Sequence, residues 1–137
     1  MATNIREVMT PSPQTVEADG TAAEAARLMK QADAGMIPVV QGRRLVGTVT
    51  DRDIAIRVVA EGRDAGSTTV GEIASTDVVT IGPDQDIAEA LGLMASNQVR
   101  RLPVVEGETL IGVVAQADVA RVADERRVGE TVEQISQ

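Results

Sequence analysis

The sequence contains no cysteine and no histidine among its 137 residues. Without cysteine there is neither a disulfide framework nor a thiolate nucleophile. Without histidine, the usual zinc sites, histidine-based acid–base catalysis and Ser-His-Asp triads are excluded. Tyrosine is absent too, which leaves no convincing pair of nucleophile and base. We therefore expect a protein that is not an enzyme and that requires no metal or cofactor.

Phenylalanine and tryptophan are also absent, and the formal net charge is −8. The core must therefore consist of aliphatic residues and methionine, and no aromatic side chain is present on which a base could stack. The negative charge argues against nucleic acid as the main partner. No apolar run approaches the length of a membrane span, and residues 1–13 lack the apolar segment of a signal peptide. A cytoplasmic protein without a membrane partner is the expectation.

What the sequence does have is an internal repeat. Residues 5–57, shifted forward by 65 positions, align with residues 70–122 without a gap. About a third of the aligned positions are identical, and most of the others exchange one aliphatic residue for another. One supersecondary unit has therefore been built twice. We assign repeat 1 to 1–62, a linker to 63–68, repeat 2 to 69–124 and a polar tail to 125–137.

Each repeat shows the pattern β-α-β-β-α, which predicts an α/β (α+β) fold. Thr21 with Glu24, and Asp86 with Glu89, are typical of helix starts, and Gly35 is placed to end the first of these helices. The expected strands are 15–16, 37–40, 45–49, 78–81, 102–105 and 110–115. The expected helices start at 21 and 86 and cover 51–60 and 118–123, and residues 1–13 are expected to be extended or irregular.

A single repeat of roughly 55–60 residues would bury too little surface to be comfortable alone. We therefore expect the two repeats to share a core within one domain and to pack with pseudo-two-fold symmetry.

The stretch after the second hairpin strand differs between the repeats. Residues 47–53 read GTVTDRD, whereas the matching residues 112–118 read GVVAQAD. Thr50 with Asp53 is typical of a helix cap. The same geometry also suits a phosphate at free helix N–H groups and a ribose diol at the carboxylate. Both interpretations stay open, although the second repeat keeps its aspartate after Ala115 has replaced the threonine, which favours function.

Three motifs accompany the repeat: Val8-Met9-Thr10, the hydrophobic-Pro-Val strands at 37–39 and 102–104, and the Gly-x-x-Thr-x-x-Asp run at 47–53. With these motifs, the chain resembles the CBS-domain pair, or Bateman module. The resemblance covers residues 4–123 and is specific because the repeat has no gap. The chain looks most like small stand-alone actinobacterial CBS proteins of the hypoxic response protein type.

This resemblance implies a regulatory module that binds an adenosyl ligand in clefts between the two repeats. The ligand expected is AMP, ADP or ATP, with S-adenosylmethionine or NAD as alternatives. The family's ribose-binding aspartate falls on Asp53 and Asp118, and each cleft takes the segment before the first strand of the opposite repeat. Cleft one would combine Thr48, Thr50, Arg52, Asp53, Ser75, Asp77 and Val78. Cleft two would combine Asp118 with Thr10, Ser12 and Pro13.

The resemblance also implies that the two clefts differ. A basic phosphate contact often precedes the hydrophobic-Pro-Val strand in this family, and here that position holds Arg100 in repeat 2 but Gly35 in repeat 1. Since cleft two has lost its hydroxyl, we expect cleft one to be the principal site, with Arg100 reaching its phosphate region. Asp77 points the other way, because it would repel phosphates or call for Mg²⁺. Adenine would lie between aliphatic groups such as Val78 and Val99.

We therefore predict a non-enzymatic sensor whose adenosyl ligand changes how it meets a protein partner that the sequence does not identify. As in the family, two chains are expected to pair into a homodimer through their helices. The alternative is a ligand-free dimerisation or interaction module in which Asp53 serves only to cap its helix.

Overall fold

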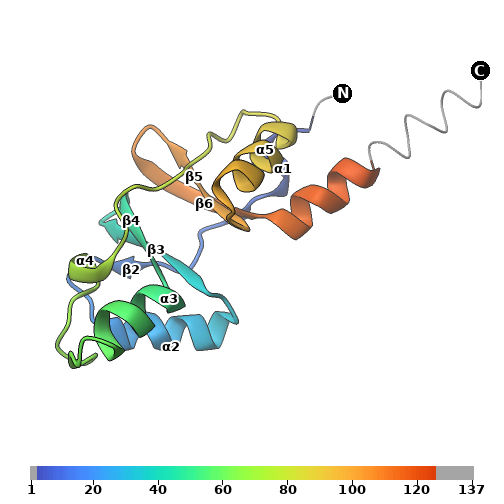
Figure 1. The fold of residues 1–137 in the computed structure, drawn as a ribbon. Coiled ribbons are helices and arrows are strands. Elements are labelled where there is room, and N and C mark those ends of the chain that lie inside the picture. The colour runs from blue at the N-terminus through green and yellow to red at the C-terminus, as the bar shows by residue number, and fades with distance from the viewer. Residues whose placement is uncertain (1–2, 126–137) are drawn as a thin grey trace, which may run out of the picture. The chain divides into compact units, whose positions relative to one another are not determined.

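The computed structural model describes residues 3–125, which divide into two compact units (Figure 1). Unit 2 comprises Pro13–Val78 and Gly107–Leu110, and unit 1 comprises residues 3–12, 79–106 and 111–125. The segment that leads each repeat therefore belongs to the unit built mainly from the other repeat. Apart from Glu125, the predicted tail lies outside the described residues. The bounds assigned to the repeats and the shared core remain predictions.

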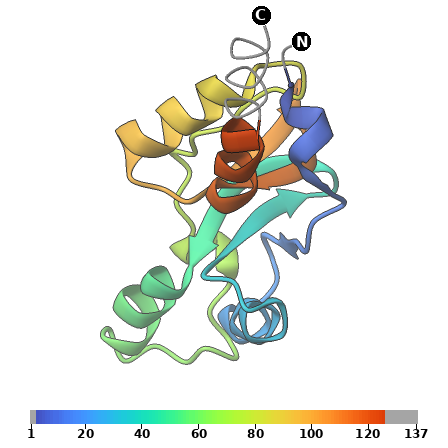
Figure 2. The same cartoon turned by 90° about the vertical axis from the view of Figure 1, so that its right-hand side faces the viewer.

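Unit 2 is built on a small mixed sheet. Its elements are β2 (Val16–Glu17), α2 (Ala22–Ala32), β3 (Met36–Gln41), β4 (Arg44–Thr50), α3 (Asp51–Ile54), the π-helical turn η1 (Ala55–Val59) and α4 (Val70–Ile73). Strand β2 pairs with β3 in parallel, and β3 pairs with β4 antiparallel, with a register shift between Val39 and Val40. Helix α2 lies beside α3 and is seen nearly end-on in Figure 2.

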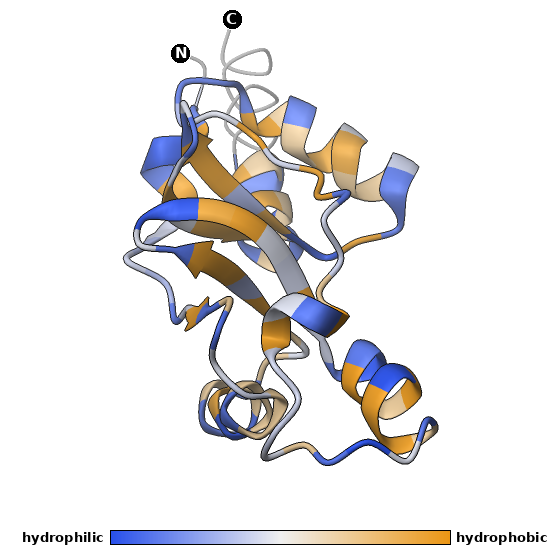
Figure 3. Ribbon diagram, turned by 90° about the vertical axis from the view of Figure 1, so that its left-hand side faces the viewer, coloured by the Kyte–Doolittle hydropathy of each residue, from blue (hydrophilic) through white to orange (hydrophobic). Residues whose placement is uncertain are grey.

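The core of unit 2 lies between these helices and the sheet. Helix α2 buries Ala22, Ala25 and Met29, which recur at helical spacing on one face. They meet Val39 and Val49 of the two central strands, which are fully buried. Figure 3 shows the apolar colour concentrated along these strands, whereas polar residues occupy much of the outer surface of α2.

Unit 1 contains the equivalent hairpin and helices. Its elements are α1 (Ile5–Val8), β1 (Thr10–Pro11), α5 (Ile87–Asn97), β5 (Arg101–Glu106), β6 (Thr109–Ala115) and a C-terminal helix described over 116–125. Strand β6 pairs with β5 and, antiparallel, with β1. Ile5, Met94, Leu102 and Val119 meet in one buried cluster, so α1, α5 and the C-terminal helix cover the hairpin together. These elements confirm the predicted α+β class.

Local signals predicted the starts of the long helices correctly. The Thr21 hydroxyl accepts a hydrogen bond from the Glu24 N–H at 3.1 Å. The Asp86 carboxylate does the same for the Ala88 N–H at 2.8 Å. The predicted end of α2 at Gly35 is wrong, because Asp33 takes the left-handed conformation with φ of 51° and ends the helix earlier. A short polar side chain tolerates this conformation well enough for an aspartate to serve.

The predicted strand at 78–81 is wrong and reduces to a single parallel bridge between Ile81 and Val104. The reason lies two residues further along. In repeat 1 the Ala18 N–H continues the pairing by donating to the Val40 carbonyl at 3.0 Å. Pro83 holds the matching position in repeat 2 and has no N–H to donate, so the ladder stops.

Two short helices were not predicted. Residues 5–8 form α1, although an extended or irregular segment was expected there, and residues 70–73 form α4 within repeat 2's leading segment. Both follow a capping pattern that the sequence contains: Asn4 with Glu7, and Thr69 with Glu72. The pattern was readable, but each helix is a single turn without a long apolar stripe to support it.

Candidate functional site at the junction of strand and helix

The junction between β4 and α3 in unit 2 is closed by a reciprocal cap. Thr50 Oγ1 accepts from the Asp53 N–H at 3.0 Å, and Asp53 Oδ2 accepts from the Thr50 N–H at 2.9 Å. The Asp53 side chain is only 16% exposed, and its Oδ1 lies 3.9 Å from Arg57 Nε. Within residues 3–125, no donor makes a hydrogen bond to Oδ1. The cap therefore orients the carboxylate and leaves one of its oxygens available.

The leading segment of repeat 2 lies against this junction within unit 2. Thr48 and Ser75 exchange both backbone hydrogen bonds, at 2.9 and 2.8 Å. The approach is so close that a Cβ on Gly47 would lie 2.7 Å from the Ser75 carbonyl oxygen. Glycine is therefore required at this position, and it brings Ser75 alongside β4. Asp77 further along the segment is exposed, and Val78 is half-buried.

The first N–H groups of α3 are already engaged. The Asp51 N–H donates to the Gly35 carbonyl at 3.0 Å, and the Arg52 N–H donates to the Asp51 carboxylate at 2.8 Å. The Asp53 N–H donates to the Thr50 hydroxyl. The expectation that the helix start offers free N–H groups to a phosphate is therefore wrong for residues 51–53. An anion beside this helix would instead meet the side chain of Arg52, which is exposed.

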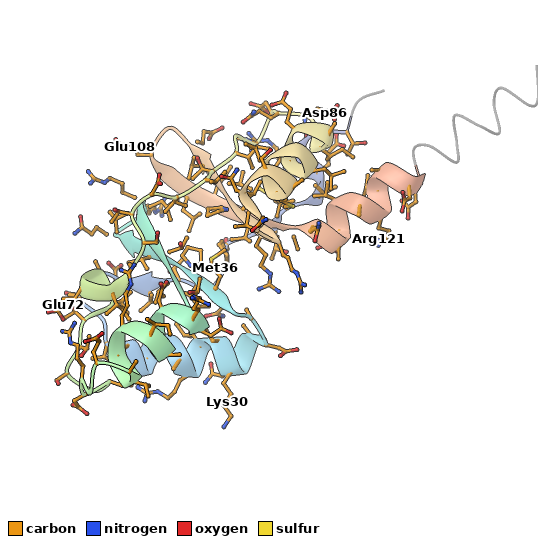
Figure 4. All side chains as sticks on the ribbon, in the orientation of Figure 1. Lys30, Met36, Glu72, Asp86, Glu108 and Arg121 are labelled. Carbon is orange, nitrogen blue, oxygen red and sulfur yellow. The ribbon has the colours of Figure 1, made fainter. Side chains whose placement is uncertain are left out.

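The equivalent junction in unit 1 is more open. Ala115 stands where Thr50 stands and supplies no hydroxyl, while the Gln116 N–H donates to the Arg100 carbonyl at 2.7 Å. This bond places the backbone of Arg100 at the start of the helix that carries Asp118. The Asp118 side chain is 46% exposed and lies 3.6 Å from Nη2 of Arg121. Arg121 is labelled in Figure 4. Among the described residues, Asp118 is thus held by its own helix and lacks the cap that orients Asp53.

The structure brings some of the predicted site residues together within unit 2. Thr48 pairs with Ser75, and Thr50 with Asp53. The side chains of Arg52 and Asp77 are exposed and make no hydrogen bond or ion pair within residues 3–125. The remaining predicted residues, Val99, Arg100 and Asp118, belong to unit 1. The Val99 N–H closes α5 by donating to the Met94 carbonyl at 3.0 Å. The ligand-binding role of every one of these residues stays a prediction.

Arg57 contacts the candidate site and was not among the residues predicted from the sequence. It follows Asp53 by four positions, a spacing that places two side chains on the same face of a helix. That spacing was visible in the sequence and could have indicated the contact with Asp53. Its second contact, from Nη1 to the Ile73 carbonyl at 3.2 Å, joins residues far apart in the chain and had no local signal.

Helix α4, which precedes Ser75, is capped at its start by the carboxylate of Glu72, which is labelled in Figure 4. The Thr69 N–H donates to Glu72 Oε2 at 2.9 Å, the Thr69 hydroxyl contacts the same oxygen at 3.0 Å, and Arg63 Nη2 lies 3.1 Å away. The backbone hydrogen bond from Thr69, its hydroxyl and the positive charge of Arg63 together lower the pKa of Glu72. The carboxylate of Glu72 therefore holds the start of α4 and links this helix to Arg63.

Residues 3–125 contain no group of three or more histidine, cysteine, aspartate or glutamate side chains arranged to hold a metal ion. None of the helices in that range has both the length and the apolar character of a membrane span.

Comparison with known proteins identifies the family. The family model of the CBS domain matches residues 5–60 and 70–125. The chain belongs to the CBS domain family. The CBS domain-containing protein YhcV of Bacillus subtilis is 46% identical over 117 residues, covering 85% of this chain and 83% of that protein. Hypoxic response protein 1 of Mycobacterium tuberculosis is 35% identical over 134 residues, covering 97% of this chain and 94% of that protein.

Solved CBS structures match the fold. A crystal structure of Hypoxic Response Protein I with two coordinated zinc ions has a TM-score of 0.81 and 37% identity, covering 87% of this chain and 98% of that one. CBSX2 in complex with AMP has a TM-score of 0.78 at 22% identity, over 90% and 98% of the two chains. The CBS domain pair of MJ0100, in complex with 5'-methylthioadenosine and S-adenosyl-L-methionine, has a TM-score of 0.78 at 23% identity, covering 92% of this chain and 99% of that one. The likenesses to CBSX2 and MJ0100 concern the fold alone. With a CBS domain matched in each repeat, the chain is a CBS-pair regulatory module.

Proposed function

We propose that this protein is a non-enzymatic sensor that binds an adenosyl ligand, with AMP, ADP or ATP as the first choice, at the β4–α3 junction of unit 2. The observation that carries the proposal is the Asp53 carboxylate. Its Oδ2 is fixed by the Thr50 N–H, its side chain is largely buried, and its Oδ1 has acceptor capacity left. A ribose diol offers two hydroxyl donors to such an oxygen.

The surroundings of Asp53 support a nucleotide. Arg52 is exposed at the same helix start and carries the positive charge that a phosphate requires, while half-buried Val78 offers an aliphatic surface for adenine. Exposed Asp77 disfavours free phosphates there and favours either a ligand with few charges or one accompanied by Mg²⁺. Support for the ligand class comes from the fold neighbours with AMP and with S-adenosylmethionine. The zinc of the hypoxic response protein is not part of the proposal, because this chain has no histidine or cysteine.

Isothermal titration with AMP, ATP, NADH and S-adenosylmethionine tests the proposal. Asp53→Asn retains an oxygen for the Thr50 N–H but removes the charge, so affinity should fall by about 10- to 100-fold, the loss typical of a charged hydrogen bond. The matched variant Asp118→Asn, which alters the less oriented aspartate, should cost far less at the tighter site. Absence of binding by the wild type, or equal loss in both variants, contradicts the proposal.

An interaction module is the second candidate, and one surface favours it. Ile56 is 51% exposed and Val59 is 71% exposed, and both lie on η1 of unit 2. Figure 3 shows this helix with broad apolar bands. The matching positions in repeat 2 are Arg121 and Asp124. Large apolar side chains exposed together on a helix are typical of surfaces that associate, so pairing of two chains through this face is part of the proposal.

Light scattering after size exclusion tests this second candidate. Val59→Glu combined with Ile56→Glu should convert a dimer to a monomer, whereas Ala88→Glu on an exposed position of α5 should leave the mass unchanged. Asp53→Asn separates the two candidates, because it should weaken nucleotide binding by about 10- to 100-fold without changing the dimer mass. A dimer that survives the double substitution rules out this face.

A further inference from the structure

The guanidinium of Arg57 contacts two separate parts of unit 2. Its Nε lies 3.9 Å from Asp53 Oδ1, and its Nη1 donates a hydrogen bond to the Ile73 carbonyl at 3.2 Å. Asp53 belongs to the helix that follows β4, whereas Ile73 ends α4 in the leading segment of repeat 2. One side chain therefore links the candidate ligand carboxylate to the segment that carries Ser75.

The two contacts of Arg57 differ in kind. The distance to Asp53 Oδ1 is longer than a hydrogen bond, so the guanidinium attracts the carboxylate electrostatically without using the oxygen's lone pairs. The contact with Ile73 is a hydrogen bond to its backbone carbonyl. Ile73 is fully buried and lies two residues before Ser75, which forms a β-bridge with Thr48. Arg57 can thus orient Asp53 and still leave Oδ1 open to a ligand.

Unit 1 has no counterpart to this link. The position that matches Arg57 is Val122, which packs against the buried cluster of that unit. The arginine near Asp118 is Arg121, and within residues 3–125 it donates no hydrogen bond to a backbone carbonyl. The helix differs too: Arg57 lies in the π-helical turn η1, closed by the Ala60 N–H on the Ala55 carbonyl at 2.9 Å, whereas 116–125 is α-helical throughout. Such π turns occur frequently at functional sites.

We propose that Arg57 is a positioning residue of the nucleotide site: it orients the Asp53 carboxylate and fixes the segment from Ile73 to Ser75 against β4. Ligand affinity and the attachment of this segment therefore depend on the same side chain. The ligand half of this inference rests on the proposed function, whereas the attachment half stands without it.

The test uses Arg57→Met and Arg57→Lys in the full chain, with Arg27→Met as the matched control. Arg27 is another exposed arginine of unit 2, and within residues 3–125 its side chain makes no hydrogen bond or ion pair with Asp53, Ile73 or Glu72. Amide hydrogen exchange without ligand reports the attachment of the segment. Exchange at the Ser75 and Thr48 amides should accelerate by about tenfold in Arg57→Met, as expected for loss of a charged hydrogen bond, and stay near the wild-type rate in Arg27→Met.

Titration with AMP reports the effect on Asp53. Arg57→Met should weaken AMP binding by about five- to tenfold, and Arg57→Lys should recover part of the loss because it restores a positive charge. In an Asp53→Asn background, Arg57→Met should cost almost nothing further, because the two residues act as a unit. Unchanged exchange in Arg57→Met overturns the attachment, and unchanged AMP affinity or full additivity overturns the positioning of Asp53. A wild type that binds no AMP contradicts the proposed function, and the exchange result then decides the role of Arg57 alone.

Discussion

Asp53 and Asp118 hold the same position in the repeat, yet they have different surroundings. Asp53 is 16% exposed and is bound by the Thr50 amide, whereas Asp118 is 46% exposed and has Arg121 of its own helix beside it. The difference follows from a few substitutions at matching positions, chiefly threonine to Ala115 and arginine to Val122. A duplicated frame can therefore keep one fold twice while only one copy keeps an oriented carboxylate.

The cores of the two units should be the least different parts, and truncating them should have the largest effects. Met29 and Met94 occupy matching positions, at 7% and 1% exposure. Met94→Ala should lower the free energy of unfolding by about 3 kcal/mol and Met29→Ala by about 2 kcal/mol, because cavity costs rise with burial. Urea denaturation measures both losses. A smaller loss for Met94 than for Met29 would show that unit 1 repacks more easily than its burial indicates.

Each leading segment packs closely against a glycine of a neighbouring strand, and replacing that glycine should have the next largest effect on stability. A Cβ on Gly47 would lie 2.7 Å from the Ser75 carbonyl oxygen, whereas a Cβ on Gly112 first meets the flexible Met9 side chain at 2.6 Å and then the Thr10 carbonyl oxygen at 2.9 Å. Gly47→Ala should therefore cost about 2 kcal/mol and Gly112→Ala somewhat less, in line with overpacking in rigid sites.

The control for this pair is Gly92→Ala in the middle of α5, where a Cβ would meet nothing within 4 Å. That substitution should stabilise the protein by about 0.5–1 kcal/mol, because alanine favours the helix. Thermal or urea unfolding of the three variants ranks them. If Gly47→Ala proves harmless, the segment that carries Ser75 is not held as closely to β4 as the structure has it.

The sequence indicated three helix caps in which the deciding interaction is local. The caps of Thr21, Asp86 and Thr50 each join residues at most three positions apart, and each could be predicted from the residue types. The pairing of Thr48 with Ser75 joins distant segments, and only the family resemblance indicated it. The contact of Arg57 with the Ile73 carbonyl had neither a local pattern nor a family motif, so the sequence offered no route to it.

The missed short helices and the lost strand show the same limit in another form. A one-turn helix such as α4 depends on its cap and on the burial of Val70 and Ile73 by the rest of unit 2, which no local window contains. Conversely, the apolar residues before Ile81 favour a strand, but Pro83 removes the donor that would extend it. Tertiary burial decided the first case, and a single proline decided the second.

Exchanging the cap between the units should have an intermediate effect. Thr50→Ala removes the hydroxyl that binds the Asp53 N–H and should cost about 1 kcal/mol. Ala115→Thr supplies the missing hydroxyl at the start of the C-terminal helix and should gain a few tenths to about 1 kcal/mol if it accepts from the Asp118 N–H. Urea denaturation gives both values, and amide exchange at residue 118 shows whether the new cap forms. A destabilising Ala115→Thr would mean that unit 1 cannot adopt the geometry of Thr50.

The smallest effect separates Glu72 from its counterpart Glu7. The pKa of Glu72 is lowered by the hydrogen bonds from Thr69 and by Arg63, so its stabilising contribution is present above its unfolded pKa, near the ordinary 4.5, and is lost as the pH falls through the lower folded pKa. The melting temperature of Glu72→Gln should therefore lie slightly below that of the wild type at about pH 6, and the two should converge as the pH falls below the folded pKa of Glu72. The Glu7 carboxylate has no hydrogen bond or ion pair within residues 3–125, so Glu7→Gln removes no such contact and should leave the melting temperature at about pH 6 close to that of the wild type. Parallel curves for Glu72→Gln and the wild type would show that the cap of α4 holds equally well without the charge.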